Sequence, residues 1–141
     1  MVEIRIQYDG GLRCTAVHAP SGAKMVTDAP VDNLGKGESF SPTDLVATAL
    51  GTCILTTMAI VAERQGWSFA GASITVEKHM VADPARRIGK LEVRVRIPGS
   101  FDAKARETLE RTAHTCPVHH SLAANVDVPI AFEWLAASVK A

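Results

Sequence analysis

Two cysteines that lie far apart in the chain are the residues most able to do chemistry. Cys116 directly precedes Pro117, a pattern typical of a helix N-terminus, where free N–H groups and the helix dipole favour a thiolate. Cys53 lies within the uncharged stretch Leu45–Ala62, where burial raises the pKa of a thiol unless a cation or donor offsets it. Because buried cysteines often act only as small apolar side chains, position alone leaves Cys53 either structural or reactive.

The histidines after Cys116 offer a second chemistry. His119 and His120 place two imidazoles within a turn of this cysteine, but zinc needs four ligands and the motif supplies half of them. Cys14 with His18 could complete the set only across the fold. The alternative is a capping cysteine beside two solvated histidines. The three cysteines include no CxxC pair, so they do not resemble a structural disulfide framework.

The stretch Ser41–Arg64 predicts the long helix that must position Cys53. Ser41 is a favourable N-cap, Pro42 suits the first helical position, and Asp44 can return a hydrogen bond in a capping box. A helix that is apolar nearly all round is normally the buried centre of a domain. Its threonines, glycine and polar ends argue against a membrane span, although its length is borderline.

The rest of the chain predicts an α+β fold with an antiparallel sheet, because strand runs and helix runs segregate instead of alternating. We expect one domain over residues 1–141. Apolar and polar residues alternate as in strands, and proline and glycine mark the turns. The expected strands are 2–8, 12–18 and 23–27, which form a meander, and 73–81, 91–97 and 126–132; the expected helices are 102–114, capped by Asp102, and 116–124. Pro129 makes the last strand an edge or bulged strand.

Composition limits the classes of partner. The formal net charge is zero and the isoelectric point is near 7.0, which gives no electrostatic case for nucleic acid or an anionic membrane. The first residues, MVEIRIQYDGG, lack the apolar core of a signal peptide. We therefore expect a cytoplasmic protein, in which thiols stay mostly reduced.

The segments SPTDLVATALGTC and HTCPVHHSL resemble the OsmC/Ohr family of osmotically inducible and organic hydroperoxide resistance proteins, in a divergent OsmC-like branch. The resemblance covers nearly the whole chain. It implies an intertwined homodimer with central helices buried between the sheets, and thiol peroxidase chemistry without metal, haem or flavin. It also implies that Cys53 is the peroxidatic cysteine and Cys116 the resolving cysteine.

The resemblance further implies an arginine from the N-terminal strands, paired with a glutamate in an Asn-Pro-Glu pattern at the start of the cysteine helix. Here the pattern reads Ser41-Pro42-Thr43, so a threonine stands where the glutamate should be. Arg13 lies in the right region for the arginine, and Asp44 could orient it. From their positions alone, Arg13 is an ordinary solvated strand residue and Asp44 an ordinary helix cap.

The hypothesis is therefore a cytoplasmic, dimeric thiol peroxidase that reduces organic hydroperoxides and is recycled by a dithiol reductant of the lipoyl type. Two alternatives use the same fold. One is a binding module for a small apolar ligand, favoured by the threonine in place of the glutamate. The other is a redox sensor that is oxidised once and signals through its dimer.

Overall fold

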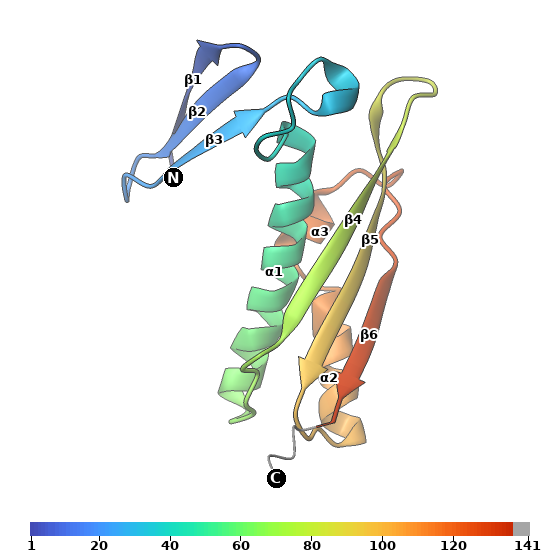
Figure 1. Cartoon of the computed structure of the whole chain (residues 1–141). Helices are drawn as coiled ribbons and strands as arrows, with labels where there is room; N and C mark the ends of the chain where they lie inside the picture. Colours follow the sequence, from blue (N-terminus) through green and yellow to red (C-terminus); the bar gives the residue numbers. More distant parts are fainter. Residues whose placement is uncertain (137–141) are drawn as a thin grey trace. The chain divides into compact units, whose positions relative to one another are not determined.

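The computed structural model describes residues 1–136, and these fall into two compact units (Figure 1). We call Met1–Val46 the N-terminal unit and the part of the chain that starts at Ala47 the C-terminal unit. Helix α1 (Pro42–Arg64) begins in the first and runs through the second. The single domain expected over 1–141 stays a prediction.

The N-terminal unit is a three-stranded antiparallel sheet in the order β1-β2-β3. Its strands are β1 (Ile4–Gly10), β2 (Arg13–His18) and β3 (Lys24–Asp28), and a short 3-10 turn, η1 (Val31–Asn33), follows. The predicted meander is confirmed. The side chains of β1 alternate as predicted, yet Ile4, Ile6 and Tyr8 remain exposed in the single chain.

Helix α1 starts with the predicted capping box. The Asp44 N–H donates to Ser41 Oγ at 3.1 Å, and the Ser41 N–H donates to Asp44 Oδ2 at 2.9 Å. These bonds satisfy two backbone donors that the first turn of a helix leaves free. Gly66, at φ 74°, ends the helical path, and the Trp67 N–H bonds back to the Ala62 carbonyl at 2.9 Å. Local sequence signals therefore account for both ends of α1.

One face of α1 packs into the core. Its buried residues are Ala47, Leu50, Gly51, Ile54, Met58 and Ala62. Gly51 permits a close approach, because a β-carbon there would stand 3.0 Å from a methyl carbon of Val76 on the neighbouring strand. The even apolar composition predicted burial on every side, whereas the opposite face, with Ala49 and Ile60, is exposed in one chain. By length and composition alone α1 could also cross a membrane, but its packed face is that of a core helix.

The C-terminal unit packs helices against a sheet with the order β4-β5-β6. Its elements are β4 (Ser73–Val81), β5 (Arg87–Pro98), α2 (Ala103–Ala113), α3 (Pro117–Ser121) and β6 (Ile130–Leu135). Figure 1 shows α2 and α3 behind this sheet. The buried core comes from the inward-facing side chains of β5, namely Leu91, Val93, Val95 and Ile97, and from Ala105, Leu109 and Ala113 of α2. The predicted cap of α2 is confirmed, since Asp102 Oδ1 accepts the Ala105 N–H at 2.8 Å.

The sequence patterns were wrong in three details of this unit. The last strand, β6, spans Ile130–Leu135 and not 126–132. Strand β6 pairs with β5 in parallel, not antiparallel, because α2 and α3 carry the chain back to the end at which β5 starts, as a crossover connection does. The third helix ends at Ser121 instead of Ala124. Strand β6 is an edge strand, as Pro129 predicted, and the Pro129 carbonyl accepts the Val93 N–H at 2.9 Å.

Candidate active site

Cys53 lies near the middle of α1, between side chains that form the core. Leu50 and Ile54 are fully buried, whereas Cys53 itself is half-buried. Its Sγ lies 3.9 Å from the Thr57 hydroxyl oxygen, one helical turn further along. The thiol therefore sits at the boundary of the apolar core with a polar group beside it.

Cys116 is the N-cap of α3 and is completely buried. Its Sγ accepts the His119 N–H at 3.4 Å, which is the bond that a capping side chain makes. Pro117 occupies the first position of α3, where its missing N–H costs no hydrogen bond. The predicted N-terminal position of this cysteine is confirmed.

The fold brings these two sulfur atoms within hydrogen-bonding reach of each other. All three cysteines are free thiols, and Cys14 lies on β2 in the other unit. The proximity of Cys53 and Cys116 is a tertiary fact, because one residue comes from α1 and the other from the turn before α3. Two adjacent thiols can form a disulfide with little rearrangement when either is oxidised.

The surroundings move the pKa values of the two thiols in opposite directions. Burial raises the pKa of Cys53, but hydrogen bonds from the Cys116 thiol, the Val118 N–H and the Thr57 hydroxyl outweigh it, so the pKa falls below its ordinary value. Burial raises the pKa of Cys116, and the neighbouring Cys53 raises it further. These shifts favour the thiolate at Cys53 over that at Cys116, and the Cys116 thiol is one of the hydrogen-bond donors that lower the pKa of Cys53.

Replacing Thr57 with valine should shift the pH dependence of Cys53 alkylation to higher pH. The thiolate reacts and the thiol does not, so removing a hydrogen bond that stabilises the thiolate raises the pKa and delays the rise in rate. The rate of reaction with iodoacetamide, measured against pH by peptide mass spectrometry, checks this. Thr56→Val, at an exposed position one residue earlier, is the matched control and should leave the profile where it is.

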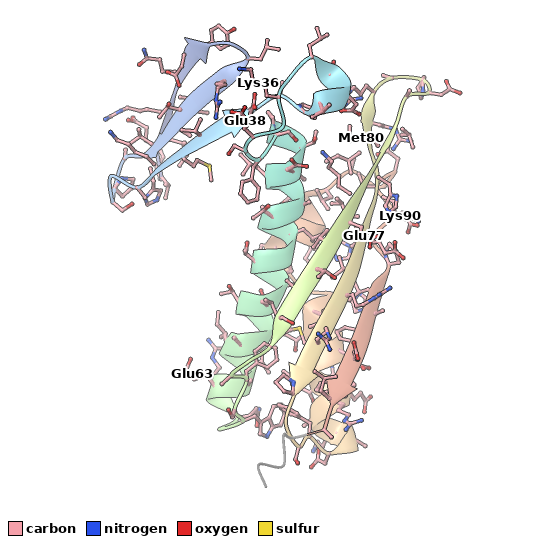
Figure 2. The ribbon with its side chains drawn as sticks, in the orientation of Figure 1. Lys36, Glu38, Glu63, Glu77, Met80 and Lys90 are labelled. Atoms are coloured by element: carbon pink, nitrogen blue, oxygen red, sulfur yellow. The ribbon has the colours of Figure 1, made fainter. Side chains whose placement is uncertain are left out.

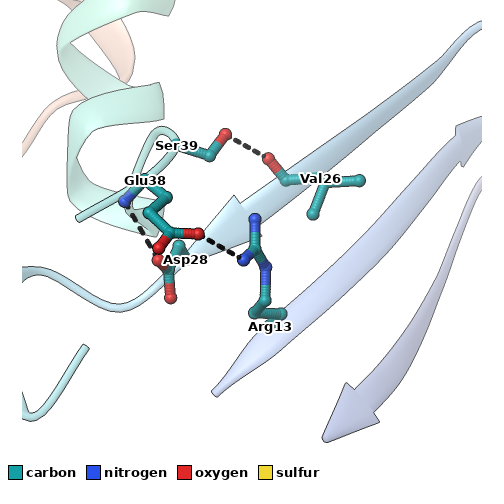
Figure 3. A network of polar contacts seen from close by, with 5 residues as sticks. All are labelled: Arg13, Val26, Asp28, Glu38 and Ser39. Carbon is teal, nitrogen blue, oxygen red and sulfur yellow. Dashed lines mark hydrogen bonds and ion pairs between the residues drawn. The ribbon is translucent and has the colours of Figure 1, made fainter. Parts of the chain in front are cut away.

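Arg13 lies at the start of β2 and forms an ion pair that the sequence did not predict. Its Nη1 is 3.0 Å from Glu38 Oε2 (Figure 3). The Glu38 N–H donates to Asp28 Oδ2 at 3.0 Å, and the Asp28 side chain is almost fully buried. Ser39 donates its hydroxyl to the Val26 carbonyl at 2.7 Å, and the Asp28 N–H donates to the Phe40 carbonyl at 3.1 Å, so several hydrogen bonds hold the segment that carries Glu38 to β3.

The four predicted site residues therefore fall into two groups. The structure brings Cys53 and Cys116 together in the C-terminal unit, while Arg13 and Asp44 belong to the N-terminal unit. Asp44 has the capping role described above, and Glu38 is the carboxylate paired with Arg13. The sequence pattern did not predict Glu38, because the family resemblance places the glutamate directly after Pro42. The available signal was an acidic residue in the polar run just before the helix.

The surroundings of the His119 side chain bear on the zinc alternative at Cys116. In residues 1–136, no group of three or more converging histidine, cysteine or acidic side chains includes Cys116 or His119. The His119 Nδ1 atom is buried without a hydrogen-bond partner in this part of the chain. Burial lowers the pKa of His119, with a further contribution from His114 and His120. Within residues 1–136, Cys116 and His119 therefore do not belong to a group of ligands that could hold zinc.

The model of the OsmC-like protein family matches residues 35–131, more than half of the chain. Comparison with curated protein sequences gave no match. Among solved structures, a Psychrobacter arcticus protein, provisionally described as an osmotic stress induced and detoxification response protein, is 39% identical with a TM-score of 0.88, over 94% of this chain and 96% of that chain.

Two more distant structures share the fold alone. The organic hydroperoxide resistance protein OsmC of Legionella pneumophila is 24% identical with a TM-score of 0.73, over 94% of this chain and 96% of its own. The organic hydroperoxide resistance protein OhrB of Bacillus subtilis is 18% identical with a TM-score of 0.70, over 94% and 98%. The family match and the similarity to the Psychrobacter protein confirm the resemblance stated from the two cysteine motifs. The chain belongs to the family of OsmC-like proteins.

Proposed function

We propose that this protein is a thiol peroxidase that reduces organic hydroperoxides, with Cys53 as the nucleophile and Cys116 as the resolving cysteine. The observation that carries the proposal is the pairing of two thiols whose pKa values are shifted in opposite directions. A nucleophile needs thiolate character, and a resolving thiol must stay close without competing for the peroxide. Relatives with this fold are named as organic hydroperoxide resistance proteins.

The proposed reaction has three balanced steps. The Cys53 thiolate attacks the terminal peroxide oxygen, the O–O bond breaks, and the leaving alkoxide takes up a proton to become an alcohol, so that Cys53 becomes a sulfenic acid. The Cys116 thiol then attacks the Cys53 sulfur, which forms a disulfide and releases water. A dithiol reductant of the lipoyl type restores both thiols by exchange and is itself oxidised to a disulfide.

The experiment that tests the proposal is disulfide mapping. Reduced protein is treated with about one equivalent of an alkyl hydroperoxide, in keeping with the one-to-one stoichiometry of thiol oxidation, then alkylated and digested. We expect a cross-linked peptide that joins Cys53 to Cys116, with Cys14 recovered as the alkylated thiol. Recovery of all three cysteines as alkylated thiols would contradict the proposal. Steady-state turnover with a dithiol then separates a peroxidase from a sensor that is oxidised once.

We also propose that Arg13 is the cation that stabilises the Cys53 thiolate, and that Glu38 orients it. Asp44 is a weaker candidate for that orienting role. The contacts that support Glu38 are its 3.0 Å ion pair with Arg13 and its backbone bond to buried Asp28. An oriented guanidinium favours the charged form of a nearby thiol. Glu38 would then supply, from the loop before α1, the carboxylate that the Ser41-Pro42-Thr43 pattern lacks.

Changing Glu38 to glutamine should slow the reaction of Cys53 with hydroperoxide and move its rate profile to higher pH. Without the carboxylate, Arg13 is no longer held, so the thiolate loses stabilisation and its pKa rises. Rapid-mixing measurements of peroxide reduction at several pH values check this. Glu38→Asp should recover part of the rate, and Glu63→Gln, at an exposed end of α1, should change nothing. An unaltered profile in Glu38→Gln would exclude this role and leave the cysteine assignment standing.

We propose that the protein is a homodimer. The supporting observation is apolar surface that one chain leaves exposed, including Ile6, Tyr8 and Met25 of the N-terminal sheet and Ile60 of α1. Exposed apolar patches mark interfaces in soluble proteins. Sedimentation equilibrium at micromolar concentration should give the mass of two chains, and the mass of a single chain would refute the dimer.

A further inference from the structure

The outer face of the β4–β5 pair carries a second group of chemically competent side chains, away from the thiols. Glu77 and His79 stand two residues apart on β4, so both point to the same face of the sheet. Glu92 on β5 is the direct cross-strand partner of Glu77. One donor atom from each of the three residues lies within 4.8 Å of the others. Figure 2 labels Glu77 on this strand, with Lys90 nearby.

The donor atoms stand at ion-pair distances, which are longer than hydrogen bonds and also suit ligands around a metal ion. His79 Nε2 lies 3.5 Å from Glu92 Oε2 and 3.8 Å from Glu77 Oε2, and both separations exceed the usual hydrogen-bond range. Zinc binds imidazole nitrogen and carboxylate oxygen at about 2.0–2.2 Å in a tetrahedral arrangement, which puts neighbouring ligand atoms roughly 3.3–3.6 Å apart. Small side-chain adjustments would therefore seat an ion between the three groups.

The charges at this position also favour a cation. Two carboxylates that face each other directly across antiparallel strands repel one another. A divalent ion between them would remove that repulsion and use the nitrogen of His79 as well. Lys90, the cross-strand partner of His79, adds a positive charge beside the group, but its long flexible stem allows the ammonium to turn away into water.

We propose that Glu77, His79 and Glu92 form a binding site for a divalent transition-metal ion of the zinc class. Imidazole selects such ions over magnesium and calcium, which prefer oxygen ligands throughout. Three protein ligands on one exposed face leave the fourth position to water. The bound ion links β4 to β5 and so stabilises the sheet of the C-terminal unit.

The experiment is a zinc titration of the full chain in which Cys14, Cys53 and Cys116 are all replaced by serine, because thiolates would otherwise bind the metal. We expect isothermal calorimetry to give one zinc ion per chain, and NMR to show the His79 imidazole shifting as zinc is added. His79→Ala and Glu92→Gln should each weaken binding by at least about tenfold. Two control variants, His114→Ala and Glu133→Gln, remove an imidazole and a carboxylate elsewhere in the chain. Both should bind zinc with the affinity of the parent.

Two results would overturn this site. One is the absence of saturable zinc binding to this serine-substituted parent at millimolar zinc. The other is binding that His79→Ala retains with parental affinity, which would place the ion elsewhere. Each variant changes an exposed or half-exposed side chain, and circular dichroism confirms that it is folded. Because the thiols are absent throughout, either result leaves the proposed peroxidase function untouched.

Discussion

Replacing Cys53 with serine should abolish hydroperoxide turnover, lowering the steady-state rate by at least about three orders of magnitude, as expected when an enzyme loses its nucleophile. A serine hydroxyl is not ionised at neutral pH, so the hydrogen bonds that favour the Cys53 thiolate have no anion to stabilise. The oxygen of serine is also a far weaker nucleophile toward peroxide than sulfur. The lower rate should therefore come from the chemical step and not from weaker binding of the hydroperoxide.

The fold should tolerate this change. Serine is close to cysteine in size, and within a helix its hydroxyl can bond to the carbonyl four residues earlier, so the half-buried position leaves no unsatisfied polar group. Turnover of cumene hydroperoxide with a dithiol reductant is the measurement, with circular dichroism as the check on folding. Cys14→Ser is the matched control, because it removes a thiol that the proposed reaction does not use, and it should keep the parental rate. A Cys53→Ser protein with parental turnover would refute the assignment.

Replacing Cys116 with serine should stop turnover after a single oxidation of Cys53. The sulfenic acid forms as in the parent, but no thiol stands beside it to make the disulfide, so each chain consumes about one equivalent of peroxide. With further peroxide the trapped sulfenic acid proceeds to sulfinic acid. Intact-protein mass spectrometry should show the gain of one oxygen atom and then of two, and dimedone should capture the first product.

This variant should also retain the local structure. Serine is among the favoured N-cap residues, and it can accept the His119 N–H that Cys116 Sγ accepts in the parent. A loss of turnover in Cys116→Ser would therefore be caused by the missing thiol and not by unfolding of α3. Sustained catalytic turnover in this variant would mean that the reductant attacks the sulfenic acid directly and that Cys116 is not needed for recycling.

The local structure of this protein follows from short-range patterns in its sequence. The capping box of Ser41 and Asp44, the Asp102 cap and the N-cap position of Cys116 were all predicted, because each depends on side chains within one helical turn. Alternation of apolar residues in β5 likewise gave the buried face of that strand. The two cysteine motifs, in their order and separation, indicated the family that the comparisons confirm.

The tertiary structure decided the features that short-range sequence patterns do not encode. The parallel pairing of β6 depends on the route of the chain through α2 and α3, which alternation within a strand does not encode. The ion pair of Arg13 with Glu38 depends on how the loop before α1 is bonded to β3. Most of all, the lowered pKa of Cys53 depends on two donors from a distant segment, the Cys116 thiol and the Val118 N–H. Burial and the nearby Cys53 raise the pKa of Cys116. The nearby sequence determines the local backbone geometry of a residue. The electrostatic environment of a thiol is set by all the groups that the whole fold places around it.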